Sequence, residues 1–211
     1  QVFGLSVATN WLGYALLAGA LFVLYPPELP ARWAVGVTGL RTIGGLMLLL
    51  ALAYVAAGAW APRRGWHWRS HAIALPTLRM ALWQGGVGVA NWLLIGATVY
   101  ALMRPLGAGY AEVLAVTLIA AVAGVISHIP AGLGVLEAVF LALLAPRHGT
   151  PGVLAGLLTY RALYYLVPLL PAVARWLFRL DGAAASVFGM GTVFANTVLL
   201  GVPLVQVTLG E

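Results

Sequence analysis

The residue that suggests chemistry first is Arg161, an arginine inside a long apolar run that begins at Pro151. A charged side chain in the middle of a membrane span costs at least ~2.5 kcal/mol on insertion scales, so it persists only beside a partner or a wet cavity. Glu137 is the other charge deep in this half of the chain, and we expect the two to form an ion pair. Such a pair either shapes a functional site or only fixes how helices pack.

A second signal is the stretch of residues 124–137, the broken segment, which interrupts an apolar run with proline, glycine and polar residues. Non-helical backbone inside a membrane survives only when protein covers it or when it lines a cavity. A helix that begins near Gly132 would point free N–H groups into the break, which suits phosphate. Ser127 and His128 lie at the other lip and could donate to a headgroup; for His128 the alternative is a helix-terminal hydrogen bond.

These features define one set of candidate substrate-binding residues around an anionic headgroup. Two tyrosines join the set because they follow Arg161 by three and four residues, which places them on its helical face. The set is Ser127, His128, Pro130, Gly132, Gly134, Glu137, Arg161, Tyr164 and Tyr165.

Enzymatic chemistry is not expected from this sequence. It shows no nucleophile–base–orienter set and no P-loop, and its 5 acidic residues leave little for acid–base catalysis. His67 and His71 have i,i+4 spacing, which suits a metal if that stretch is helical. Because no third ligand accompanies them, solvated loop histidines are the better interpretation. We therefore expect no catalytic residue, no metal and no cofactor.

The composition defines the class of protein that must hold these residues. Of 211 residues 63% are hydrophobic and 8% charged, and the mean hydropathy is +1.00. Several runs approach the ~20 apolar residues that span a bilayer. The 11 arginines scattered between these runs indicate topology and lipid-headgroup contact, not nucleic-acid binding. The absence of cysteine excludes disulfides.

The apolar runs predict an all-α, polytopic membrane protein with six to seven spans and a broken or re-entrant helix pair around 124–137. The predicted helices cover residues 5–24, 42–60, 80–102, 110–126, 133–145, 151–175 and 183–209. Gly44 and Gly45 would permit close helix packing. Gln84 and Asn91 share a helical face and are expected to make interhelical hydrogen bonds, with cavity lining as the alternative.

Loop charge predicts the orientation. The basic loops at 62–79 and 175–181 fall on one side by alternation, which is the cytoplasmic side by the positive-inside rule. The loops that contain Glu28, Arg104 and Arg147 then share the opposite side. The chain starts at Gln1 without Met and enters an apolar run almost at once, so we expect it to be N-terminally incomplete.

The motifs SHIPAGLGVLE at 127–137 and TYRALYYLVP at 159–168 resemble the transmembrane domain of the lysylphosphatidylglycerol synthetase/flippase family, of the multiple peptide resistance factor type, with its stand-alone UPF0104 relatives. The resemblance covers roughly residues 1–180. It implies a multi-pass bacterial inner-membrane protein that moves phospholipid, including aminoacyl-phosphatidylglycerol, between leaflets. In two-domain members of that family synthesis belongs to a separate soluble domain, and the resemblance here concerns the membrane domain, so synthesis is not implied. The partners implied are membrane phospholipids with anionic headgroups.

The tail has a different resemblance. FGMGTVFANTVLLGVPL at 188–204 is similar to an early membrane segment of the auxin efflux carrier family. We therefore treat residues 181–211 as an additional transmembrane segment. Two other functions stay open beside lipid translocation: a small-solute secondary transporter, and a membrane subunit without transport of its own. Homo-oligomerisation is also left open.

Overall fold

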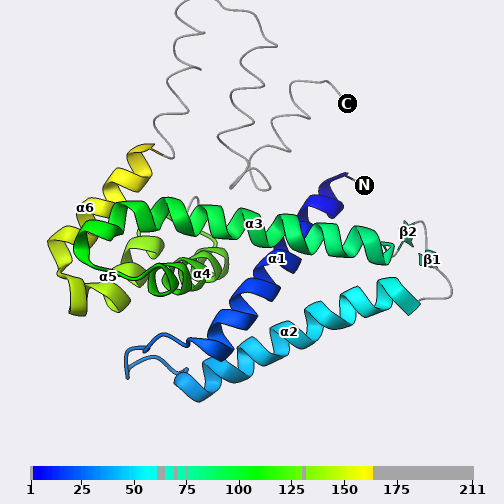
Figure 1. Cartoon of the computed structure of the whole chain (residues 1–211), viewed down its shortest axis with the longest axis horizontal. Coiled ribbons are helices and arrows are strands. Elements are labelled where there is room, and N and C mark those ends of the chain that lie inside the picture. Colours follow the sequence, from blue (N-terminus) through cyan, green and yellow to red (C-terminus); the bar gives the residue numbers. More distant parts are fainter. Residues whose placement is uncertain (1, 61–64, 69–70, 75, 130–131, 164–211) are drawn as a thin grey trace, which may run out of the picture.

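The computed structural model describes residues 2–60, 65–68, 71–74, 76–129 and 132–163. Within them it shows an assembly of helices and one short hairpin (Figure 1). The helices are α1 (Val2–Leu24), α2 (Val37–Trp60), α3 (Leu78–Met103), α4 (Tyr110–Ser127), α5 (Val135–His148) and α6 (Thr150–Arg161), with a 3-10 turn, η1 (Arg104–Leu106), after α3. The all-α class is confirmed. The predicted domain boundary near residue 180 lies outside the described residues.

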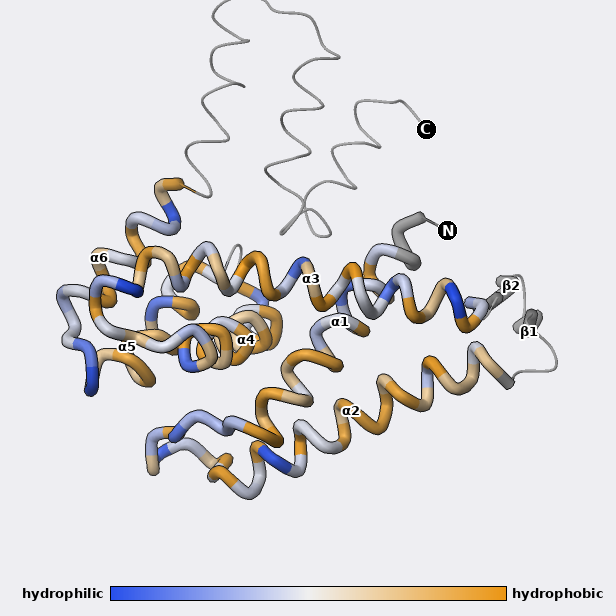
Figure 2. Tube along the Cα trace, in the orientation of Figure 1, coloured by the Kyte–Doolittle hydropathy of each residue, from blue (hydrophilic) through white to orange (hydrophobic). Residues whose placement is uncertain are grey.

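Four of the described helices are long and apolar enough to cross a membrane: Ser6–Leu24, Val37–Ala59, Leu78–Leu106 and Tyr110–Ser127. Figure 2 shows hydrophobic residues along most of α2. Leu49 and Leu50 on this helix are 63% and 69% exposed, which is the pattern of a lipid-facing surface. Of the two last predicted spans, 183–209 and the part of 151–175 after residue 163 lie outside the described residues.

The start of α2 and the structure of one loop differ from the predictions. α2 begins at Val37, not at residue 42, so Arg41 lies within the helix and is exposed. The helix tolerates this charge because a long arginine stem lets the guanidinium reach the interface. The predicted loop at 62–79 contains strands β1 (Gly65–Trp68) and β2 (His71–Ala74), paired antiparallel. His67 and His71 therefore lie in strands, and the helical metal-pair alternative is wrong for this backbone.

Small residues let α1 approach two neighbours closely. A side chain at Gly88 of α3 would collide with the Thr9 carbonyl oxygen and with Gly13 of α1. A Cβ at Gly44 of α2 would lie 2.9 Å from the Gly19 carbonyl oxygen of α1. The packing role predicted for Gly44 is confirmed. The same prediction for the next glycine, Gly45, is wrong, because a Cβ there would meet open space.

Polar contacts also tie these helices together. The Tyr54 hydroxyl of α2 donates to Gln84 Oε1 of α3 at 3.2 Å, which confirms an interhelical hydrogen bond for Gln84. For Asn91 it stays a prediction. The Tyr14 hydroxyl donates to the Leu118 carbonyl oxygen at 2.9 Å and joins α1 to α4.

The second half of the chain packs around its own apolar core. Side chains from α3, α4, α5 and α6 meet there, and several are fully buried: Met103, Val116, Phe140, Leu144, Val153 and Leu157. α4 and α5 run antiparallel, because the beginning of α4 and the end of α5 share polar contacts at Glu112 and Arg147. This hairpin agrees with the expectation that the broken helix pair returns the chain to the side from which it started.

The glycine contact between α1 and α3 can be tested with adjacent substitutions on one helix. Gly88→Ala should lower the free energy of unfolding by about 1–3 kcal/mol, because the methyl group enters a filled contact. Gly86→Ala is the matched control, since its Cβ would meet open space, and alanine favours a helix by about 1 kcal/mol over glycine. Thermal unfolding in detergent measures both. An equal loss in both variants would contradict the close contact.

Candidate functional site

The first lip of the broken segment is the end of α4. Ser127 Oγ donates to the Gly124 carbonyl oxygen at 2.8 Å and accepts from the Ile129 N–H at 3.3 Å, so it closes the last turn. His128 follows with a φ of 53°, and its Nδ1 lies 2.8 Å from the Ile126 carbonyl oxygen. The helix-terminal hydrogen bond proposed as the alternative for His128 is thus present. Contact of Ser127 or His128 with a ligand stays a prediction.

The second lip is the beginning of α5. Gly132 and Gly134 have φ values of 58° and 81°, a region in which only glycine is unstrained. The Gly134 N–H donates to Glu137 Oε2 at 3.0 Å, so the glutamate caps its own helix. α5 begins at Val135, later than the sequence indicates. The two glycines therefore permit a tight turn before α5. Pro130 lies outside the described residues.

Arg161, at the end of α6, reaches this lip and binds it at three points. Its Nε and Nη2 donate to the two oxygens of Glu137, the Nη2 bond being 2.9 Å long. Nη2 also donates to the Gly132 carbonyl oxygen at 3.2 Å. The side chains of Arg161 and Glu137 are only 16% and 17% exposed. The predicted ion pair is confirmed, in the bidentate form that arginine and carboxylate favour.

The predicted phosphate site at the N-terminus of α5 stays a prediction, and the structure shows what a phosphate would meet there. The Glu137 carboxylate already lies at that helix end and accepts the Gly134 N–H. Its charge offsets that of the Arg161 guanidinium, so an anion would have to compete with Glu137 both for the guanidinium and for the helix end. Sequence reasoning treated the helix end and the glutamate as separate features, whereas a glutamate at the third helical position is itself a capping signal.

The structure thus brings together four members of the predicted set: Gly132, Gly134, Glu137 and Arg161. Ser127 and His128 bond to the end of their own helix. Tyr164 and Tyr165, like Pro130, lie outside the described residues, so their assignment stays a prediction.

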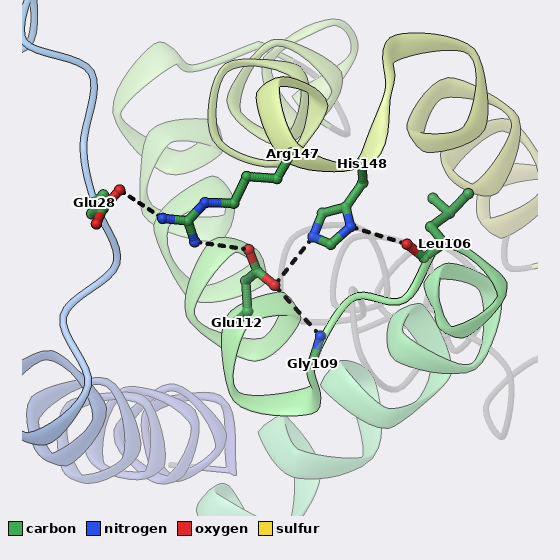
Figure 3. Close-up of polar contacts among 6 residues, drawn as sticks. All are labelled: Glu28, Leu106, Gly109, Glu112, Arg147 and His148. Carbon is green, nitrogen blue, oxygen red and sulfur yellow. Dashed lines mark hydrogen bonds and ion pairs between the residues drawn. The ribbon is translucent and has the colours of Figure 1, made fainter.

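A second polar assembly was not anticipated as a site. It is shown in Figure 3 and is called the polar network; its members are Glu28, Glu112, Arg147 and His148. Arg147 donates to Glu28 at 2.6 Å and to Glu112 at 3.5 Å. The other oxygen of Glu112 lies 3.3 Å from His148 Nε2. The network joins the α1–α2 linker to the beginning of α4 and the end of α5, which agrees with the alternation that placed these loops on one side.

A sequence signal for this network existed. Glu112 falls in the first turn of α4, and Arg147 and His148 fall in the last turn of α5, the positions that helix dipoles favour for each sign of charge. The sequence gives no sign that Arg147 contacts Glu28, which lies 119 residues earlier in the chain.

Comparison with known proteins gives two relatives. The chain is 44% identical to the inner membrane protein YbhN of Escherichia coli over 178 residues, which is 84% of this chain and 56% of YbhN. It is 32% identical to the uncharacterized protein slr0712 of Synechocystis sp. over 162 residues, 75% of this chain and 49% of that protein. No protein-family model matches.

These comparisons, taken with the apolar helices, define the class of the protein. The chain is a multi-pass inner-membrane protein, as the sequence predicts. It spans about half the length of the curated relatives it matches. The predicted cytoplasmic side of residues 62–79 stays a prediction, and 175–181 lie outside the described residues.

The ion pair predicts a non-additive pattern of stability. Arg161→Met should lower the free energy of unfolding by about 3–5 kcal/mol, because it strands the Glu137 carboxylate in a largely buried place. Adding Glu137→Gln should recover part of that loss, since the charge disappears and glutamine still caps Gly134. Chemical unfolding in mixed micelles measures the free energy of unfolding of the wild type, the two single variants and the double variant.

The exposed pair Arg147–Glu28 supplies the control cycle. Its side chains are 55% and 79% exposed, so Arg147→Met and Glu28→Gln should each change stability by less than about 1 kcal/mol. If the Arg161 and Glu137 substitutions proved equally mild and additive, the buried pair would not hold the broken segment.

Proposed function

We propose that this chain belongs to a protein that translocates phospholipid between the leaflets of the inner membrane, and that it does so without an enzymatic step. The observation that carries the proposal is the Arg161–Glu137 pair, which closes a non-helical segment among membrane helices. Polar backbone and charge at such a place are costly in lipid and mark substrate pathways more often than they mark structure alone. The motif resemblance to the flippase-type family supports the same function.

The geometry suggests how an anionic headgroup would be held. Because the closed pair is neutral, phosphate must replace the Glu137 carboxylate on the guanidinium of Arg161. Guanidinium binds phosphate and carboxylate with the same two-pronged geometry, so the exchange keeps both hydrogen bonds. Glu137 retains the Gly134 N–H during the exchange and becomes available to an ammonium group, as an aminoacyl lipid would provide.

Access to the pair then requires movement of the broken segment. Arg161 also donates to the Gly132 carbonyl oxygen, so a lipid that takes the guanidinium loosens the glycine turn as well as the ion pair. In this account substrate binding and opening are one event, and phosphatidylglycerol-type lipids are the partners. His128 at the other lip is exposed and would contact the same headgroup.

Translocation can be measured with the protein in proteoliposomes. Fluorescent phosphatidylglycerol and its lysyl form should move between leaflets, and Arg161→Leu should abolish that movement because phosphate loses its ligand. Quenching of outer-leaflet fluorescence by dithionite follows the rate. Arg104→Gln is the control, since this exposed arginine lies in the turn after α3 and outside the proposed site.

Two results would contradict the proposal. If the folded protein moves neither lipid, lipid translocation is wrong for this chain. If Arg161→Leu remains folded and moves lipid at the wild-type rate, the pair is structural. Uptake of a small solute coupled to an ion gradient would instead favour the secondary-transporter alternative.

A further inference from the structure

A groove of about 590 Å³ lies beside the polar network, between the α1–α2 linker, α4 and α5. That volume is within the ~300–1,000 Å³ range of small-molecule sites. One wall is apolar and comes from Ala115 and Val116 of α4 together with Ala142 and Leu143 of α5. Prolines of the linker form the opposite side. The walls therefore suit hydrocarbon, while the charges lie at the rim.

The rim is an ion pair that opens easily. Glu28 projects from the linker toward Arg147 of α5, as Figure 3 shows, and the two side chains are 79% and 55% exposed. Exposed pairs of this kind contribute about 0–1 kcal/mol. A ligand that brings its own charges can replace the Glu28–Arg147 contact at little cost. The less exposed Glu112, which Arg147 also contacts, stays fixed by the N–H of Gly109.

The charges at the rim select the kind of ligand. Two carboxylates, Glu28 and Glu112, face one guanidinium, Arg147. A purely anionic lipid would be attracted by the arginine but repelled by the two carboxylates. A purely cationic lipid would bind the carboxylates and leave the arginine without an anionic partner. A ligand with a phosphate and an ammonium group satisfies both signs at once.

The position of the groove selects the source of that ligand. Glu28 follows the end of α1, Glu112 lies in the first turn of α4, and Arg147 lies in the last turn of α5. Because α1 and α4 are long and apolar enough to span the membrane, their ends mark the membrane–water boundary. That boundary is where lipid headgroups lie, with acyl chains directed along the apolar walls.

We propose that this groove binds a zwitterionic phospholipid with a primary-amine headgroup, of the phosphatidylethanolamine type. Its phosphate binds Arg147, its ammonium binds Glu28 and Glu112, and its glycerol and first methylenes lie against the apolar wall. The inference deepens the proposed function, because it adds a second lipid site at the opposite end of the α4–α5 hairpin from Arg161. It concerns equilibrium binding, so it can be tested apart from translocation.

Native mass spectrometry of the detergent-solubilised protein tests the site. From an equimolar mixture of phosphatidylethanolamine and phosphatidylglycerol, the wild type should retain phosphatidylethanolamine about tenfold more, which corresponds to one hydrogen bond to a charged group. Glu28→Gln should weaken that preference, because the ammonium loses one of its carboxylates. Arg147→Gln should lower the retention of both lipids, because both carry the phosphate that the guanidinium binds. Arg32→Gln, an exposed arginine of the same linker, should leave the preference and the retention of both lipids unchanged. Phosphatidylcholine, whose quaternary ammonium has no N–H, should bind more weakly than phosphatidylethanolamine.

Equal retention of the two lipids by the wild type, an undiminished preference in Glu28→Gln, or unchanged retention of both lipids in Arg147→Gln would overturn the inference. Arg161→Leu separates this inference from the proposed function, because it should stop translocation yet leave phosphatidylethanolamine retention unchanged. If translocation fails in the wild type while the rim-dependent preference persists, the proposed function is wrong and the lipid site stands. If translocation persists but the wild type shows no preference for phosphatidylethanolamine, the lipid site is wrong and the proposed function stands.

Discussion

The arrangement of the second half of the chain depends on one contact, the guanidinium of Arg161 against Glu137 and the Gly132 carbonyl oxygen. The contact fastens the end of α6 to the beginning of α5, and so fixes where the chain turns after α4. Both side chains are largely buried, so neither charge can be left alone without a large cost. The glycine turn is stable because the arginine satisfies a carbonyl that a helix would otherwise have used.

The same contact explains why both the guanidinium and the helix end are already occupied in the closed arrangement. Glu137 neutralises the arginine and caps α5 at once, so two functions that look independent in the sequence are carried by one carboxylate. Under the proposed function a lipid phosphate would compete with that carboxylate, so binding and opening would be interdependent. Structural and functional roles of the pair are therefore not alternatives in this account. The pair is the closed state that a substrate would replace.

Features that depend on nearby residues could be predicted from the sequence, whereas contacts between distant residues could not. The membrane class, the break and the Arg161–Glu137 pair follow from local composition and from the cost of charge in an apolar run, and all are confirmed. The early start of α2 and the β1–β2 hairpin were missed because hydropathy defines the apolar core of a span but not its ends. The Arg147–Glu28 contact was missed because nothing in either local sequence specifies the other.

Amide hydrogen exchange of the broken segment tests the central claim most directly. In the wild type the Gly134 N–H, bonded to Glu137, should exchange slowly. In Arg161→Met, exchange across residues 132–137 should accelerate at least about tenfold, which corresponds to 1.4 kcal/mol of lost local stability, while α1 to α3 stay unchanged. Unchanged exchange at residues 132–137 would contradict the account, because the broken segment would then hold its shape without Arg161.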